Sequence, residues 1–138
     1  MIKEFQGSYR FLSNFYPCRI VYEGIAYLSV EAFYQAQKTF SVVRKREISQ
    51  MRPGQAKRAG RDLVLRYDWE EIKLEVMEKG LRLKFADPDL KALLLETGVQ
   101  ELIEGNYWGD EFWGVYNGKG QNNLGKLLMK VRKDLSDG

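Results

Sequence analysis

The sequence contains no histidine, and this absence excludes more chemistry than any other feature of its composition. Without an imidazole, neither a Ser-His-Asp nor a Cys-His nucleophilic site can form. Acid–base chemistry near neutral pH must therefore use carboxylates, lysine, tyrosine or the single cysteine. A zinc site is also disfavoured, because histidine and cysteine are the usual zinc ligands. We expect no metal ligands and no cofactor.

Cysteine and long apolar runs are also scarce. Cys18 is the only cysteine, so no internal disulfide can form, which favours a reducing, cytoplasmic setting. No run approaches the roughly 18 apolar residues that a membrane span needs, and no secretory leader opens the chain. With 138 residues, 44% of them hydrophobic and 30% charged, the chain has the composition of a globular protein. We predict a single domain over residues 1–138, with no membrane attachment.

The net charge is only +3, from 22 basic and 19 acidic residues, and this alone does not indicate nucleic-acid binding. The basic excess is local, however, and is concentrated between Arg44 and Arg61. Two interpretations stay open for this stretch. It is either the solvated face of helices or a surface that attracts phosphate groups.

The residue pattern predicts a helix-rich domain with short β elements near its N- and C-terminal ends. Ser29 is a suitable N-cap, and Asp87 followed by Pro88 marks another helix start. Glu23-Gly24 indicates a hairpin turn. The expected strands are 19–22, 25–27, 101–104 and 112–116, and the expected helices are 29–40, 54–65, 68–85, 88–97 and 122 onward.

Three polar clusters with aromatic companions stand out against this scaffold. One is Ser13-Asn14, and another is a helical face on which residues 31, 35 and 38 recur at spacings of four and three. The third runs from Asn106 to Asn123. Aromatic planes can stack on a base for about 1–3 kcal/mol, and amides can read its donor and acceptor edges. The clusters therefore favour a flat heterocycle that carries a ribose phosphate.

The glycine-rich segment Gly118–Gly120 is a weak signal. It matches neither the GxxxxGK[ST] phosphate loop nor the GxGxxG dinucleotide turn, so a generic flexible turn remains open. Asn122, Asn123 and Gly125 follow at the start of the last helix. Amides and a glycine at a helix start allow a ligand to approach the backbone, which makes this helix entry a candidate binding site.

Three segments together resemble the NADAR, or YbiA-like, family: FLSNFYP (11–17), EGIAYLSVEAFYQAQK (23–38) and WGVYNGKGQNNLGKLLMKVR (113–132). The resemblance implies a helix-rich α+β domain that cleaves N-glycosidic bonds. Some members of the family act on phosphorylated ribosylamino-pyrimidine intermediates of riboflavin synthesis. Others remove ADP-ribose from guanine in nucleic acid and so reverse the modification made by a toxin. The implied partners are a small nucleotide-like substrate or ADP-ribosylated nucleic acid, and a cognate ADP-ribosyltransferase toxin.

The resemblance also carries over positions of its motifs. Ala32 stands where the family often has histidine, which weakens any mechanism that needs that histidine. The positions that match the family motifs are Ser13, Asn14, Phe15, Glu31, Gln35, Lys38, Trp113, Gly114, Gly118, Gly120, Asn122, Leu124 and Gly125.

Cleavage of a ribosyl C–N bond needs negative charge near the anomeric carbon and a proton for the leaving nitrogen, and two carboxylates can supply both. Glu31 and Asp110 are the candidate pair, although Asp110 has the alternative role of capping the adjacent turn. Lys38 either binds phosphate or attacks the opened sugar to form a Schiff base. We thus predict Glu31, Lys38 and Asp110 as catalytic. The predicted substrate-binding residues are Ser13, Asn14, Phe15, Gln35, Asn106, Trp108, Trp113, Gly114, Asn122, Asn123 and Gly125.

Two rival functions remain open. A non-catalytic module that binds ADP-ribose or NAD would need the aromatic and amide side chains, but not Glu31 or Asp110 as acid or base. A nucleic-acid-binding domain would instead use the basic stretch between Arg44 and Arg61. The sequence does not specify an oligomeric state.

Overall fold

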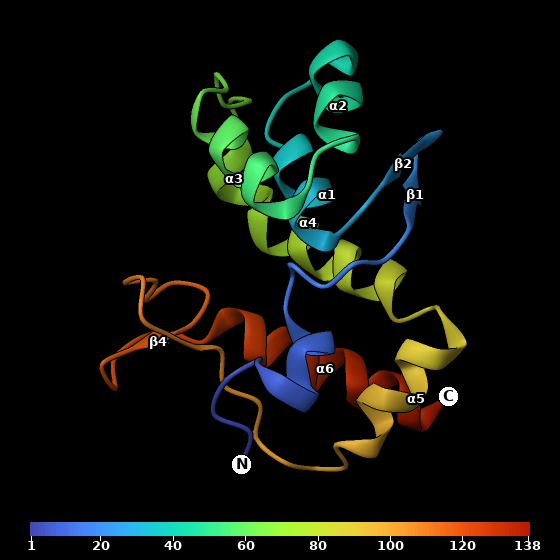
Figure 1. Ribbon diagram of the computed structural model, residues 1–138, viewed down its shortest axis with the longest axis vertical. Helices are drawn as coiled ribbons and strands as arrows, with labels where there is room; N and C mark the ends of the chain where they lie inside the picture. Colours follow the sequence, from blue (N-terminus) through green and yellow to red (C-terminus); the bar gives the residue numbers. More distant parts are fainter. The chain divides into compact units, whose positions relative to one another are not determined.

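The computed structural model describes residues 1–138, which divide into two compact units. We call residues 14–84 the central unit, and residues 1–13 with 85–138 the terminal unit. Helices dominate both units, and four short strands form two separate two-stranded sheets (Figure 1). This is the predicted α+β class. No helix combines the length and the apolar composition needed to span a bilayer.

The central unit begins with a hairpin and continues with four helices (Figure 1). Strands β1 (Ile20–Tyr22) and β2 (Ile25–Tyr27) pair antiparallel, with Ile20 opposite Tyr27. Glu23 and Gly24 both have positive φ angles, as a tight hairpin turn requires, so the predicted hairpin is confirmed. The helices that follow are α1 (Val30–Ala36), α2 (Val42–Ser49), α3 (Pro53–Arg61) and α4 (Trp69–Lys84).

Helix α1 begins as predicted and ends earlier than predicted. The Ser29 hydroxyl accepts a hydrogen bond from the Ala32 N–H at 3.1 Å, which confirms Ser29 as the N-cap. The helix ends at Ala36 and not at Phe40, and Ser41 then caps the next helix by accepting from the Arg44 N–H. Every side chain of α1 is buried, since the helix packs against α2, α3 and α4. Its polar residues therefore lie inside the unit.

Helix α3 is also shorter than predicted, because it ends at Arg61 and not at residue 65. Helix α4 has the predicted extent. Its Gly80 allows close approach to α1, because a Cβ there would lie 2.9 Å from the Phe33 ring. Tyr22 and Tyr27 meet the same ring edge-on, at centroid distances of 5.3 and 5.7 Å. Phe33 is therefore a central packing residue of this unit.

Lys84, at the end of α4, is a lysine with only 1% of its surface exposed. Its Nζ lies 5.7 Å from the centroid of the Tyr16 ring. Burial lowers the pKa of Lys84 to about 8, and the charge of Cys18 acts in the opposite direction. A buried ammonium is costly to desolvate, so the charged form of Lys84 destabilises the fold at neutral pH.

We expect Lys84→Met to flatten the dependence of stability on pH. Between pH 8 and about 10.5 the unfolded chain keeps the lysine proton and the folded chain has released it, so this residue makes stability rise with pH. The rise is roughly 2–3 kcal/mol and is absent in the variant. Urea unfolding of wild type and variant from pH 7 to pH 11 measures the difference. Lys79→Met, an exposed lysine on the same helix, is the control and should keep the wild-type slope.

The terminal unit contains a 3-10 helix, two helices and a short parallel sheet (Figure 1). These are η1 (Gly7–Leu12), α5 (Pro88–Glu96), β3 (Gly105–Asn106), β4 (Val115–Tyr116) and α6 (Asn123–Asp137). Asp87 caps α5 by accepting from the N–H groups of Asp89 and Leu90, as its sequence predicted. Leu124, Leu128 and Val131 form the buried face of α6.

Two predicted strands of this unit differ in the structure, because side chains form hydrogen bonds with their backbone groups. No strand spans 101–104, because the Asn122 amide forms hydrogen bonds with the Leu102 carbonyl and the Glu104 N–H. Within this stretch, only Leu102 forms an isolated β-bridge, and its partner is Ile2. The pairing falls instead at Gly105–Asn106. The predicted 112–116 strand shrinks to Val115–Tyr116, since the Asp110 carboxylate takes the two N–H groups before Gly114.

Candidate active site

Helix α1 places two of the predicted site residues one turn apart inside the central unit. Glu31 is 8% exposed and Gln35 is 5% exposed. Gln35 Nε2 donates a hydrogen bond to Glu31 Oε1 at 2.9 Å, which fixes the two side chains relative to each other. The Glu31 N–H donates to the Asn14 carbonyl at 3.1 Å. The structure thus joins the first motif to the second, as neither pattern could show alone.

Lys38 lies just beyond α1, and its amine is close to two aromatic rings. Lys38 Nζ is 5.6 Å from the centroid of Tyr34 and 6.0 Å from that of Trp69. Burial is the main cause that lowers the pKa of Lys38; the Glu31 carboxylate opposes it, and the positive charge of Arg61 adds to it. Near neutral pH, more of this amine is therefore neutral than in an ordinary lysine. A neutral amine is the nucleophilic form.

Two buried acceptors in the same unit have no hydrogen-bond partner. They are Asn14 Oδ1 and Gln35 Oε1. The nitrogen of each amide is used, because Asn14 Nδ2 contacts Met77 Sδ at 3.4 Å and Gln35 Nε2 binds Glu31. Buried polar atoms in folded proteins nearly always have a partner, so these oxygens are suited to accept from a bound molecule. Gly60 of α3 leaves room for the Gln35 amide, since a Cβ there would overlap its oxygen.

The two other predicted residues of the first motif, Ser13 and Phe15, fall in different units. Phe15 is partly exposed, and Lys57 Nζ lies 6.0 Å from its ring centroid. Ser13 closes the N-terminal segment of the terminal unit, and its N–H donates to the Arg10 carbonyl at 2.9 Å. Phe15 therefore belongs to the same unit as Lys38, whereas Ser13 is grouped with the terminal unit.

Asp110 adopts the alternative role that the sequence left open, the capping of its own turn. Asp110 Oδ1 accepts from the N–H groups of Phe112 and Trp113, at 3.1 and 2.8 Å. The Asn106 amide closes the same turn, donating to the Asp110 carbonyl at 2.9 Å and accepting from its N–H at 3.0 Å. These bonds give Asp110 and Asn106 a structural role; a catalytic role for Asp110 stays a prediction.

The asparagines at the start of α6 are likewise used by the backbone. Asn122 Oδ1 accepts from the Glu104 N–H, and its Nδ2 donates to the Leu102 carbonyl, both at 2.9 Å. Asn123 Nδ2 donates to the Phe112 carbonyl at 2.9 Å. The predicted binding amides of this helix entry therefore tie α6 to the two segments that precede it.

Close packing accounts for two glycines of the third motif. A Cβ on Gly114 would overlap the Glu104 carbonyl oxygen, and one on Gly125 would overlap the Leu102 carbonyl oxygen. Trp113 is partly buried, with its ring edge-on to Phe112 at a centroid distance of 4.8 Å. The third motif thus has a physical explanation within the terminal unit that needs no ligand.

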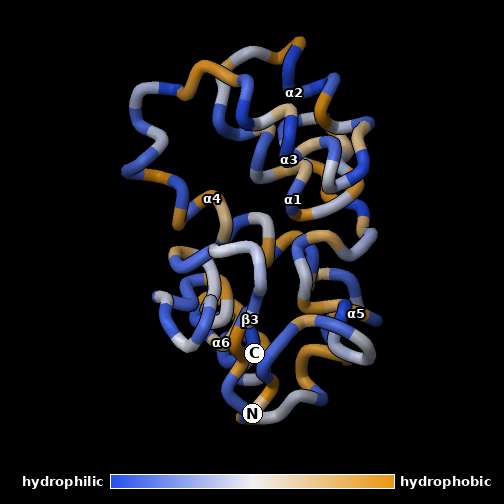
Figure 2. The backbone as a smooth tube through the Cα atoms, turned by 60° about the vertical axis from the view of Figure 1, so that its left-hand side comes forward, coloured by the Kyte–Doolittle hydropathy of each residue, from blue (hydrophilic) through white to orange (hydrophobic).

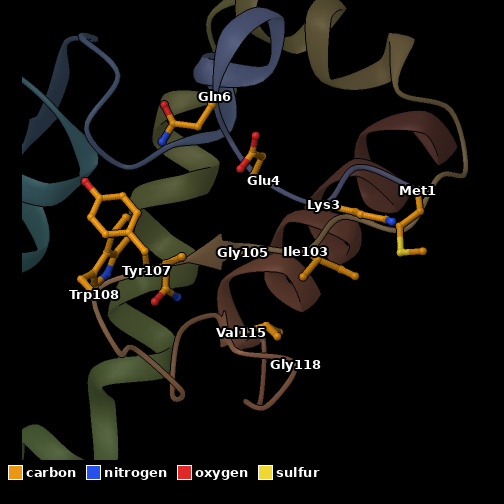
Figure 3. Close-up of a pocket in the computed structure, with 11 residues that line it drawn as sticks. Met1, Lys3, Glu4, Gln6, Ile103, Gly105, Tyr107, Trp108, Val115 and Gly118 are labelled. Atoms are coloured by element: carbon orange, nitrogen blue, oxygen red, sulfur yellow. The ribbon is translucent and has the colours of Figure 1, made fainter.

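The terminal unit also has an open groove of about 640 Å³ (Figure 3). Figure 3 shows the Tyr107 and Trp108 rings at one end of it and Met1 at the other. The two rings meet edge-on at 5.1 Å, and both are exposed. Trp108 was predicted to bind substrate, and it lies on this groove with Asn106.

Comparison with known proteins identifies the family. The NADAR domain model matches residues 2–136. The chain belongs to the NADAR family. It is 40% identical over 132 residues to N-glycosidase YbiA of Escherichia coli, covering 90% of this chain and 80% of that protein. The NMR structure of Escherichia coli YbiA matches this NADAR chain with a TM-score of 0.87 and 38% identity, over 99% of this chain and 86% of that one.

Other curated relatives of this NADAR chain carry two kinds of name. An N-glycosidase of Nostoc punctiforme is 36% identical over 135 residues, covering 92% of this chain and 86% of that protein. A riboflavin biosynthesis protein of Vibrio vulnificus is 42% identical over 133 residues, covering 92% of this chain. The chain spans only 36% of the length of that Vibrio protein. The resemblance seen in the three sequence motifs is therefore confirmed at the level of the family.

Sequence reasoning missed the aromatic surroundings of Lys38. It gave neither Trp69 nor Tyr34 a function, although both rings lie near Lys38. Tyr34 stands four positions before Lys38, a spacing at which helical side chains are neighbours, whereas Trp69 reaches Lys38 because α1 and α4 pack together. Gly60 was missed for the same reason as Trp69, since its contact with Gln35 depends on the packing of α3 against α1. No local pattern signals the contacts of Trp69 and Gly60.

Proposed function

We propose that this NADAR protein is an N-glycosidase in which Lys38 is the nucleophile and Glu31 moves the proton. The observation that carries the proposal is the placement of the Lys38 amine, which is half-buried beside two aromatic rings, has a lowered pKa and is acted on by the charge of buried Glu31. The names of its relatives, which include N-glycosidase YbiA, support the class of reaction.

The proposed reaction begins with a ribose whose C1′ is bonded to a nitrogen of the base. The sugar ring opens as the proton of the base N–H moves to the ring oxygen, which gives a C1′=N imine, and the neutral Lys38 amine adds to C1′. Glu31 carries the two protons of the Lys38 amine to the base nitrogen in turn, the first as the amine adds and the second as the base leaves. The C1′–N bond to the base then breaks, which leaves a Schiff base between Lys38 and the sugar. Water hydrolyses it, so that the net reaction consumes one water and releases free base and free sugar.

We propose two substrate classes for this site. The first is a phosphorylated ribosylamino-pyrimidine, which is supported by the naming of a relative as a riboflavin biosynthesis protein. The second is ADP-ribosylated guanine in nucleic acid, with a cognate ADP-ribosyltransferase toxin as the source of the modification. Both present amino or hydroxyl donors to the unpaired oxygens of Asn14 and Gln35.

The test is incubation of the protein with each substrate class, followed by chromatography of the products. We expect release of free base and free sugar from at least one class. Sodium cyanoborohydride should reduce the Schiff base, so that mass spectrometry finds the sugar attached to Lys38. A parallel reaction without substrate is the control and should give no adduct.

Two results would contradict the proposal. Turnover without any trapped adduct would remove Lys38 as nucleophile and favour the carboxylate mechanism. Tight binding of ADP-ribose with no turnover of either substrate, unchanged by Glu31→Gln, would instead indicate a non-catalytic binding module.

A further inference from the structure

The segment from Ser41 to Arg61, which forms α2, α3 and their connection, is the most basic part of the chain. It has seven basic residues and one acidic residue, a net charge of +6, whereas the whole chain carries +3. All other residues together therefore carry −3. Figure 2 colours much of α2 and α3 as hydrophilic. We call six of these residues the basic surface: Arg44, Arg46, Arg52, Lys57, Arg58 and Arg61.

Most of this charge is not neutralised within the protein. Glu47 is the one acid of the segment, and it pairs with Arg44 at 2.9 Å. Arg46, Arg52, Arg58 and Arg61 are exposed and form no ion pair. Such a surface attracts polyanions, because its charges are not compensated by neighbouring carboxylates.

The helix packing turns these cations outward. On α3 the buried residues are Ala56 and Gly60, four positions apart, and Gly60 contacts Gln35 of α1. Arg58 and Arg61, three positions apart, share the solvent-facing side of the same helix. The inner face of α3 thus supports the candidate active site while its outer face carries the charge.

Exposed aromatic rings accompany the basic residues. Phe15 has Lys57 over its ring, as described above. Phe40, immediately before the N-cap of α2, is 57% exposed; the Arg66 guanidinium lies 4.1 Å from its centroid and the Tyr67 ring 6.1 Å away. Tyr67 is 92% exposed. Exposed rings beside cations are the combination that binds unpaired bases, because rings stack on bases while cations contact phosphates.

We propose that the basic surface binds the phosphate backbone of single-stranded nucleic acid. Six cations over two helices and their connection exceed what the one or two phosphates of a free nucleotide can engage. Arg61 follows Gly60, which packs against the Gln35 side chain of the candidate site, so a strand bound along α3 would pass beside that site. The part of this inference that concerns the candidate site rests on the proposed function; the binding itself does not.

The experiment measures binding of an unmodified, fluorescent single-stranded oligonucleotide to the full chain by anisotropy, over a series of salt concentrations. We expect log K to fall linearly with log salt, by about 0.7 per phosphate contacted. The variant Arg46→Gln/Arg52→Gln/Arg58→Gln should bind at least 10-fold more weakly and with a shallower salt slope. Arg61 is left unchanged because it affects Lys38. The control is Lys126→Gln/Lys130→Gln/Lys133→Gln, which removes three exposed cations of α6.

Several results would overturn the inference. They are no binding, a flat salt dependence, or an equal loss in the α6 control. Tighter binding to vesicles of phosphatidylserine and phosphatidylcholine than to the oligonucleotide would assign the surface to membranes instead. Hydrolysis of a free ribosylamino-pyrimidine phosphate should be the same in wild type and in the arginine variant. Because oligonucleotide binding needs no turnover, failure of the binding and failure of the proposed function give separate readouts.

Discussion

Replacing Lys38 with methionine should lower kcat by on the order of 10³-fold or more, the largest functional effect we expect from a single change. Methionine keeps an apolar side chain of similar length between Tyr34 and Trp69, so the packing of this half-buried position is retained. What is lost is the Lys38 amine beside these two rings. Steady-state kinetics with the active substrate class measure the effect, and circular dichroism checks the fold.

Lys38→Arg separates the two roles that the sequence left open. A guanidinium keeps the positive charge but is not a nucleophile, so we expect it to be as inactive as the methionine variant. If Lys38 only bound phosphate, arginine would keep most of kcat. Lys79→Met, on α4 of the same unit, controls for loss of a lysine and should be nearly as active as wild type.

The rate of the wild-type protein should also rise with pH. The midpoint of this rise should lie below the pKa of an ordinary lysine. Burial lowers the pKa of Lys38, and the neutral form is the one that attacks, so the rate increases as the amine loses its proton. A rate that falls as pH rises through this range would contradict the assignment of Lys38 as nucleophile.

The part of the site that sequence could predict was the face of α1. The spacing of Glu31, Gln35 and Lys38 placed them on one side of a helix, and in the structure the first two are joined by a hydrogen bond. Sequence could not show that this face is buried, because burial depends on α2, α3 and α4 packing around α1. It also could not show that Lys38 lies beyond the helix end, because no capping residue in the sequence marks the end of α1 at Ala36.

The third motif shows another limit of prediction from sequence. Its asparagines and glycines have the composition of a ligand site, and a pattern of residue types cannot distinguish ligand contacts from backbone contacts. The Asn122 side chain forms hydrogen bonds with the Leu102 carbonyl and the Glu104 N–H. The Asp110 carboxylate accepts hydrogen bonds from two N–H groups of its own turn. The partners at residues 102–104 are about 20 positions away, so the fold had to be known before their bonds could be assigned. Most helices, by contrast, follow from local caps and periodicity, and the α+β fold class follows from the resemblance of three motifs to the family.

Gly125→Ala should destabilise the protein by roughly 3–4 kcal/mol, because α6 and the segment before β3 leave no space for a methyl group. The new Cβ would overlap the Leu102 carbonyl oxygen and crowd the Asn122 amide, which holds the same segment. Either α6 moves away or the Asn122 bonds break. Denaturant unfolding measures the loss.

Gly54→Ala is the matched control, because it makes the same chemical change in another helix. Its Cβ would meet only the flexible end of Arg58, at 3.8 Å, so stability should change by no more than about 1 kcal/mol, towards greater stability. The pair distinguishes two explanations of the glycine in the family motif. If Gly125 serves only the approach of a ligand, Gly125→Ala keeps its stability and loses binding. If close packing is the reason, as the contacts with Leu102 and Asn122 indicate, stability falls first and activity is lost only with the fold.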